Sequence, residues 1–165
     1  MERKRSDMKL YIKQRVFSWT DTYDVYGANQ IPKYFVKAEF FTIGHKIHIY
    51  DHASGNEVGV IREKLFTMFG GAEISAGGRE LGSITKHFSF LRPKYSIDYN
   101  GWGIEGDFFG WDYSITDRYG ETVALISKEL FNWGDTYSLE IFSDSNELDA
   151  LMTVIAIDML NCGRS

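Results

Sequence analysis

Residues 147–160 read Glu-Leu-Asp-Ala-Leu-Met-Thr-Val-Ile-Ala-Ile-Asp-Met-Leu, and this stretch near the end of the chain decides the fold. It predicts a helix that Ser143, Ser145 or Asn146 can cap, with acidic residues in its first turn. The predicted helix is apolar nearly all round, and such a helix must be buried inside a protein. The apolar side chains that we expect to form this core helix are Leu148, Leu151, Met152, Val154, Ile155, Ile157, Met159 and Leu160.

The predicted helix is too short to cross a membrane. Its apolar core, 148–160, covers 13 residues and includes Asp158, whereas a span needs about 20 residues. Its length of about 20 Å matches the rise of a strand of about six residues. The helix therefore fits the interior of a β-barrel.

The chain before this helix reads as short strands separated by turns. In one of them Val36, Ala38 and Phe40 share one face. Lys37 and Glu39 share the other, which is the alternation of a half-buried strand. About twelve strands are predicted, over 9–15, 22–26, 34–42, 46–51, 57–65, 72–75, 79–88, 94–99, 102–107, 112–116, 122–128 and 136–142. The fold class expected is mainly β, a closed barrel of about twelve strands around a buried C-terminal helix.

A weak internal repeat also favours a single closed sheet. Three segments share a turn glycine, a polar pair, an aliphatic residue, a small residue and, two positions later, an isoleucine: 55–61, 78–84 and 120–126. The small residue is Gly59, Gly82 or Ala124, and we expect a larger side chain there to crowd the helix or a neighbouring strand. The spacings of 23 and 42 residues differ, whereas a propeller or solenoid keeps one period.

Composition narrows the class of protein. A chain of 165 residues that is 44% hydrophobic is large enough for a sizeable core. We expect a charged, flexible tail over 1–7 and a single domain over 8–165. The net charge of −5 argues against nucleic-acid binding. Cys162 is the only cysteine, so an intramolecular disulfide is impossible, and no apolar secretory segment follows the tail. A cytoplasmic location is expected.

Three segments carry a resemblance to a known family. They are Met-Lys-Leu-Tyr-Ile-Lys-Gln-Arg-Val-Phe-Ser at 8–18, Gly-Asp-Phe-Phe-Gly-Trp-Asp-Tyr-Ser-Ile at 106–115, and Ala-Leu-Ile-Ser-Lys-Glu-Leu-Phe-Asn-Trp-Gly-Asp-Thr-Tyr at 124–137. With the apolar helix that follows, they make the chain resemble the bacterial members of the LURP-one-related family over roughly residues 8–161. The resemblance implies the tubby C-terminal-like fold, a twelve-stranded barrel closed around a hydrophobic helix. The family has no established catalytic residues, so none is carried over.

Relatives of the same fold include tubby proteins, which bind phosphoinositides, and phospholipid scramblases. The basic residues with which tubby proteins contact lipid do not match positions here, so a lipid function rests on analogy of fold alone. The best local candidate for an anionic headgroup is the segment 86–95, which mixes bases with aromatic residues. Its possible contacts are Lys86, His87, Arg92 and Lys94. The simpler interpretation is a hairpin whose charges are only solvated.

Other motifs fit ordinary structural roles. The Gly-x-Gly-x-x-Gly pattern at 101–106 follows a hairpin turn and precedes a strand-like run, whereas dinucleotide binding requires it between a strand and a helix. His45 and His48 should point to opposite faces of a strand, and with His52 they form no metal site that we recognise. Asp158 is costly inside the helix unless it reaches the rim of the barrel or meets a basic partner.

The carboxylates outside the helix have no spacing that indicates catalysis. A glycosidase needs two of them at a fixed separation in a cleft, and turn or rim positions are the default for Glu105, Asp107, Asp112 and Asp117. We therefore expect a non-enzymatic binding or scaffold module of unknown ligand, without cofactor or metal and with an unknown protein or lipid partner. The alternatives are peripheral binding to anionic phospholipid or phosphoinositide headgroups and an enzyme with an unrecognised cleft.

Overall fold

The computed structural model describes residues 8–13, 22–40, 43–89, 92–108, 110–129 and 136–162. Twelve strands and a short 3₁₀ turn precede one α-helix. Their bounds are β1 (Met8–Lys13), β2 (Thr22–Gly27), β3 (Pro32–Phe40), β4 (His45–Asp51), β5 (Glu57–Glu63), β6 (Gly71–Ala76), β7 (Arg79–Ser89), β8 (Arg92–Ile97), β9 (Gly103–Asp107), β10 (Asp112–Thr116), β11 (Thr122–Glu129), β12 (Thr136–Ile141), η1 (Asp144–Asn146) and α1 (Glu147–Cys162). The predicted tail at 1–7 lies outside the described residues.

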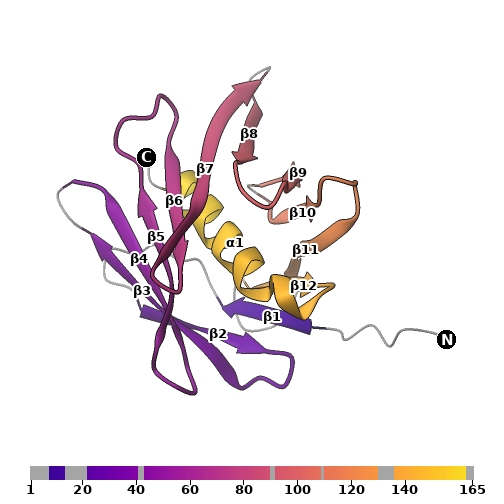
Figure 1. Cartoon of the computed structure of the whole chain (residues 1–165). Helices are drawn as coiled ribbons and strands as arrows, with labels where there is room; N and C mark the ends of the chain where they lie inside the picture. Colours follow the sequence, from indigo (N-terminus) through magenta and orange to yellow (C-terminus); the bar gives the residue numbers. More distant parts are fainter. Residues whose placement is uncertain are drawn as a thin grey trace.

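The strands form a closed antiparallel barrel in which each strand pairs with its neighbours in the sequence, and β1 pairs with β12 to complete the ring. Figure 1 shows α1 running through the space that the strands enclose. The predicted fold class and all twelve strands are confirmed. The predicted strand 57–65 is too long, because Lys64 and Leu65 leave the sheet at the end of β5.

The helix is buried as its sequence predicts. Every residue from Ala150 to Leu160 is buried, and Leu151, Met152, Val154, Ile155 and Ile157 have no exposed surface. Leu148 is partly buried against the same core. At about 1.5–3 kcal/mol for each large aliphatic side chain, this burial is the main stabilising contribution of the segment. Neither α1 nor any other helix of the described part of the chain is long and apolar enough to cross a membrane.

The barrel wall contributes aliphatic side chains from alternate positions of its strands. On β4, Ile47 and Ile49 point inward and are fully buried. The small residues of the repeat lie where the sequence predicts crowding. A Cβ atom on Gly59 would lie 2.6 Å from Sδ of Met152 on α1, and one on Gly82 would collide with Asp98.

The N-terminal end of the helix is held by an ion pair. Glu147 lies buried, with Oε1 at 2.7 Å from Nζ of Lys33, and it accepts a 2.5 Å hydrogen bond from the hydroxyl of Tyr34. The hydroxyl of Ser143 caps no backbone N–H and contacts the hydroxyl of Ser145 at 3.0 Å instead. The turn η1 thus leads the chain from β12 into the barrel.

One junction of the barrel wall is closed by side chains. Among the described residues β8 pairs with β9 only at Ser96 and Gly103, whereas β3 and β4 share seven pairs. The rings of Tyr95 and Phe108 lie 4.9 Å apart and edge to face. Aromatic packing therefore replaces backbone pairing at this junction.

Candidate functional site

The interior of the barrel contains one carboxylate among aromatic side chains. Asp158 of α1 accepts a 3.3 Å hydrogen bond from Nε1 of Trp111 and a short one from the hydroxyl of Tyr137. Burial raises the pKa of Asp158 to about 7, although both hydrogen bonds act to lower it. Burial also raises the pKa values of Tyr113 and of Tyr23, which lie close to this carboxylate. The cluster is therefore neutral when Asp158 carries a proton.

Both sequence expectations for Asp158 are wrong for the part of the chain that the structure describes, since Asp158 is buried and its hydrogen-bond partners there are Trp111 and Tyr137. Neutral donors from distant parts of the chain satisfy it instead. Trp111 and Tyr137 come from two of the segments that carry the family resemblance, 106–115 and 124–137. The two segments that resemble the family therefore contact the helix through Asp158, which local sequence pattern does not predict.

The predicted anion cluster is divided between the two faces of the sheet. Lys86 lies inside the barrel, 8% exposed, and its Nζ donates to the backbone oxygen of Leu160 at 3.4 Å. A cation there is favourable because the C-terminal end of a helix is electronegative. His87 and Lys94 are exposed cross-strand neighbours, and Nε2 of His87 lies 2.7 Å from Oγ of Ser96. Arg92 begins β8, and its side chain lies outside the described part of the chain.

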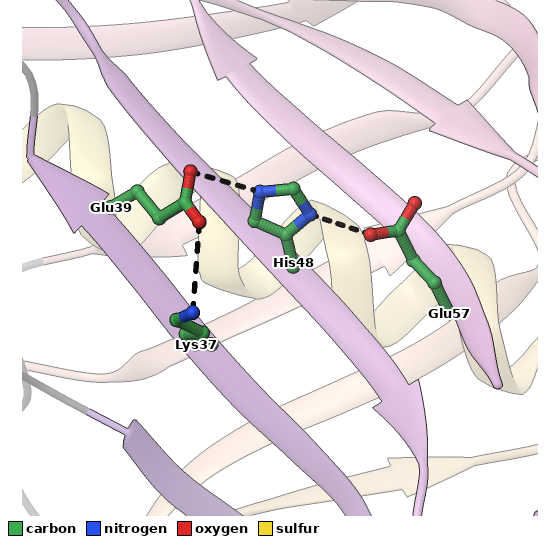
Figure 2. A network of polar contacts seen from close by, with 4 residues as sticks. All are labelled: Lys37, Glu39, His48 and Glu57. Carbon is green, nitrogen blue, oxygen red and sulfur yellow. Dashed lines mark hydrogen bonds and ion pairs between the residues drawn. The ribbon is translucent and has the colours of Figure 1, made fainter. Parts of the chain in front are cut away.

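Each of the three clustered histidines meets a carboxylate. His48 lies between two of them on the outer face of the sheet, with Nδ1 at 2.6 Å from Glu57 and Nε2 at 3.4 Å from Glu39 (Figure 2). Lys37 extends this network, with Nζ at 3.7 Å from Glu39. His45 lies 2.6 Å from a glutamate, and His52 lies 3.8 Å from an aspartate.

This network does not resemble a metal site. The carboxylates of Glu39 and Glu57 approach opposite sides of the imidazole of His48 (Figure 2), so they cannot share one ion with it. Within the described residues no group of three or more His, Cys, Asp or Glu side chains could hold a metal ion. The network ties β3, β4 and β5 together on the outside of the barrel.

The glycine pattern at 101–106 and the carboxylates near it serve turns and strand packing. A Cβ atom on Gly106 would lie 2.6 Å from Cα of Tyr113, so this glycine permits β9 to pack closely on β10. Asp117 accepts hydrogen bonds from two backbone N–H groups of the turn after β10, at 2.8 and 2.9 Å. Asp107 accepts one from Gly110 at 3.0 Å.

Large apolar side chains are exposed at one end of the barrel. The last residues of β3, β5 and β7 and the first residues of β4, β6 and β8 lie at the end where α1 finishes, here called the helix-exit end (Figure 1). Four side chains between strands and one near the end of β7 form what we name the apolar rim: Ile43 (71% exposed), Leu65 (49%), Phe66 (100%), Met68 (82%) and Phe88 (50%).

Contacts join the three described segments that carry the rim, 43–44, 65–69 and the end of β7. The rings of Phe69 and Phe88 lie 4.9 Å apart and edge to face. A Cβ atom on Gly44 would lie 3.0 Å from Cδ2 of Leu65. The rim is thus one continuous surface, and of its members only Phe88 belongs to the segment that the sequence singled out.

The charges beside the rim are strongly biased. The segments 40–46, 62–71 and 86–94, which carry the rim, contain six lysine or arginine residues and one acidic residue. The acidic residue, Glu63, is engaged by His45, whose Nδ1 and backbone N–H lie 2.6 and 3.1 Å from its carboxylate. In a chain of net charge −5, these segments are basic, and the sheet register places the next acids, Glu39 and Glu73, opposite Lys46 and Arg62.

Comparisons with known proteins give the same fold and a family. The family model described as LURP-one-related matches residues 8–158. The chain is 32% identical to the uncharacterised protein YxjI of Bacillus subtilis over 154 residues, which is 93% of each chain. It is also similar in structure to an Arabidopsis thaliana protein solved by X-ray crystallography, with a TM-score of 0.66, 14% identity, and coverage of 93% of this chain and 91% of that one. The chain belongs to the LURP-one-related family.

Proposed function

We propose that this protein is a non-enzymatic binding module that attaches peripherally to anionic phospholipid surfaces through the helix-exit end of its barrel. The observation that carries the proposal is the charge bias of that end, with six bases against one acid in the segments beside the apolar rim. Basic residues near an anionic bilayer each contribute about 1 kcal/mol of attraction. Several of them together give binding that is weak, reversible and sensitive to salt.

The bases differ in how well they can reach a surface. Arg62 and Lys94 are exposed, and Lys46 and Lys64 are partly exposed. Lys86 is buried against α1, so it adds to the local potential without touching a headgroup. The bases that face solvent come from β4, β5, β8 and the β5–β6 connection, which makes the basic surface broader than the short segment 86–94.

The alternative is an enzyme with an unrecognised cleft. A general acid needs a carboxyl group that has a raised pKa and lies within reach of a substrate. Asp158 has the raised pKa but lies enclosed between α1 and the barrel wall. Its position supports a structural role, and the helix fills the space where a barrel enzyme would hold its substrate. The single cysteine, Cys162, is consistent with our proposal of a cytoplasmic location.

Vesicle flotation tests the proposal. We expect the protein to float with vesicles that contain phosphatidylglycerol at low salt, to bind them much more weakly at high salt, and to ignore vesicles of phosphatidylcholine alone. The double variant Arg62→Glu/Lys94→Glu should lose this binding. The matched control Arg79→Glu/Arg118→Glu, which changes exposed arginines at the opposite end of the barrel, should keep it. No binding of the unchanged protein at low salt would contradict the proposal.

A further inference from the structure

The apolar rim exposes large apolar side chains to water, which is unfavourable in free energy. Phe66 is fully exposed and Met68 is 82% exposed, although large apolar side chains gain about 1.5–3 kcal/mol each from burial. Single exposed apolar residues are common on proteins, whereas contiguous exposed patches mark sites of interaction. The five side chains of the rim form such a patch, because contacts between Phe69 and Phe88 and between Gly44 and Leu65 bring the segments that carry them together.

The opposite end of the barrel provides a comparison within the same molecule. Ile31 (60% exposed) and Tyr119 (84%) are the large hydrophobic side chains that stand out there. They lie on separate turns, one between β2 and β3 and the other between β10 and β11. Apolar side chains are therefore exposed at both ends of the barrel. Among the described residues, they lie close together only at the helix-exit end.

We propose that the apolar rim inserts into the hydrocarbon boundary of a lipid bilayer, with Phe66 and Met68 as its deepest side chains. This inference rests on the proposed function and adds to it, because attraction by charge requires no insertion. The choice of a bilayer over a protein partner follows from charge and shape together. The side chains of the rim project outward, and a fluid hydrocarbon layer can accept them without a matching groove. The bases beside the rim can pair with anionic headgroups.

The charges also fix how the barrel meets the bilayer. Lys64 directly precedes Leu65 and Phe66, and a lysine at that position can keep its ammonium among the headgroups while its stem follows the apolar side chains. The other half of the helix-exit end carries Asp107 and Asp112, which face each other across β9 and β10. These acids would be repelled by an anionic surface. The barrel is therefore tilted, with the β5–β6 connection toward the bilayer.

Insertion is tested by binding that survives high salt. The double variant Phe66→Ser/Met68→Ser removes the two most exposed apolar side chains of the rim and should reduce partitioning to anionic vesicles at high salt by at least about tenfold, since each burial gains roughly 1.5–3 kcal/mol and 1.4 kcal/mol is tenfold. The control Ile31→Ser/Tyr119→Ser removes two large exposed hydrophobic side chains from the opposite end and should bind as the unchanged protein does. Equal melting temperatures show that both variants are folded.

A second measurement reports depth. In the variant Phe66→Trp, lipids brominated on their acyl chains should quench the emission of the new tryptophan beyond the quenching seen in the unchanged protein. Binding at low salt with no added quenching, and with Phe66→Ser/Met68→Ser as tightly bound as the control, would overturn insertion and leave the electrostatic proposal standing. Absence of vesicle binding at both salt concentrations would overturn both proposals. Self-association of the unchanged protein that the rim substitutions abolish would overturn insertion alone, because a second copy would then cover the exposed surface.

Discussion

Trp111 donates its indole N–H to Asp158 across 3.3 Å, and this hydrogen bond joins the segment before β10 to the helix in the centre of the barrel. Trp111 also stacks on Tyr137 at 5.0 Å, and Nζ of Lys128 lies 5.9 Å from the centre of its indole ring. Trp111 has a φ of +52°, a conformation that costs energy in a non-glycine residue. The contacts around Asp158 hold it there.

Asp158 makes the stability of the fold depend on pH. Its pKa is about 7 in the folded protein against 3.8 ordinarily, so the folded state binds more protons than the unfolded state between these values. Stability must then fall as pH rises through this window, by on the order of 4 kcal/mol at about 1.4 kcal/mol per pKa unit. We expect Asp158→Asn, which keeps an acceptor but no charge, to flatten the dependence of melting temperature between about pH 4 and about pH 7. An equally steep dependence in the variant would contradict this assignment.

The indole hydrogen bond tunes that dependence. Because the hydrogen bond from Trp111 acts to lower the pKa of Asp158, its removal in Trp111→Phe should move the midpoint of the pH dependence upward. It should also cost about 1–3 kcal/mol, as loss of a buried partner commonly does. Chemical denaturation across a pH series measures both effects. A midpoint that stays in place would show that Trp111 does not act on the carboxylate.

Gly59 provides the space into which Met152 packs. Since a Cβ atom there would lie 2.6 Å from Sδ of Met152, we expect Gly59→Val to destabilise the fold by about 1–3 kcal/mol through overpacking. Met152→Ala should offset part of that loss in the double variant. Free energies of unfolding for the two single variants and the double variant measure the coupling. Strictly additive losses would mean that the two residues do not press on each other.

The core helix tolerates no charge at its centre. Ile155 has no exposed surface, and the barrel around it is filled by aliphatic side chains. We expect Ile155→Asp to prevent folding, because an unpaired buried carboxylate is very costly. The matched variant Ile155→Val should fold and lose only about 0.5–1.5 kcal/mol. Circular dichroism and melting temperature distinguish the two variants. An unchanged melting temperature for Ile155→Asp would show that the helix does not lie in the core.

The sequence predicted the parts of this fold that depend on local pattern. Apolar residues all round 148–160 predicted a buried helix, and alternation such as that of Val36 and Ala38 predicted the strands. Alternation could also have placed Lys86 inside the barrel, since it lies two positions after the buried Ile84. The mixture of bases and aromatic residues in this segment instead predicts that its lysines face solvent.

The features that the sequence did not predict depend on contacts between distant residues. Asp158 accepts hydrogen bonds from neutral donors, Trp111 before β10 and Tyr137 on β12. The cost of a buried charge predicts a basic partner and gives no indication of these donors. The predicted strand 57–65 includes Leu65, and local pattern does not predict that Leu65, Phe66 and Met68 are exposed. Only the filled interior shows that there is no room for them and that they stand outside.

Hydrogen exchange of the unchanged protein tests most directly whether α1 occupies the centre of the barrel. We expect the backbone amides of Ala150 to Leu160 to exchange only through global unfolding, with protection equal to that of β4 and β5. Exchange of these amides far faster than that of β4 and β5 would contradict it, since the helix would then leave the barrel while the sheet stays folded.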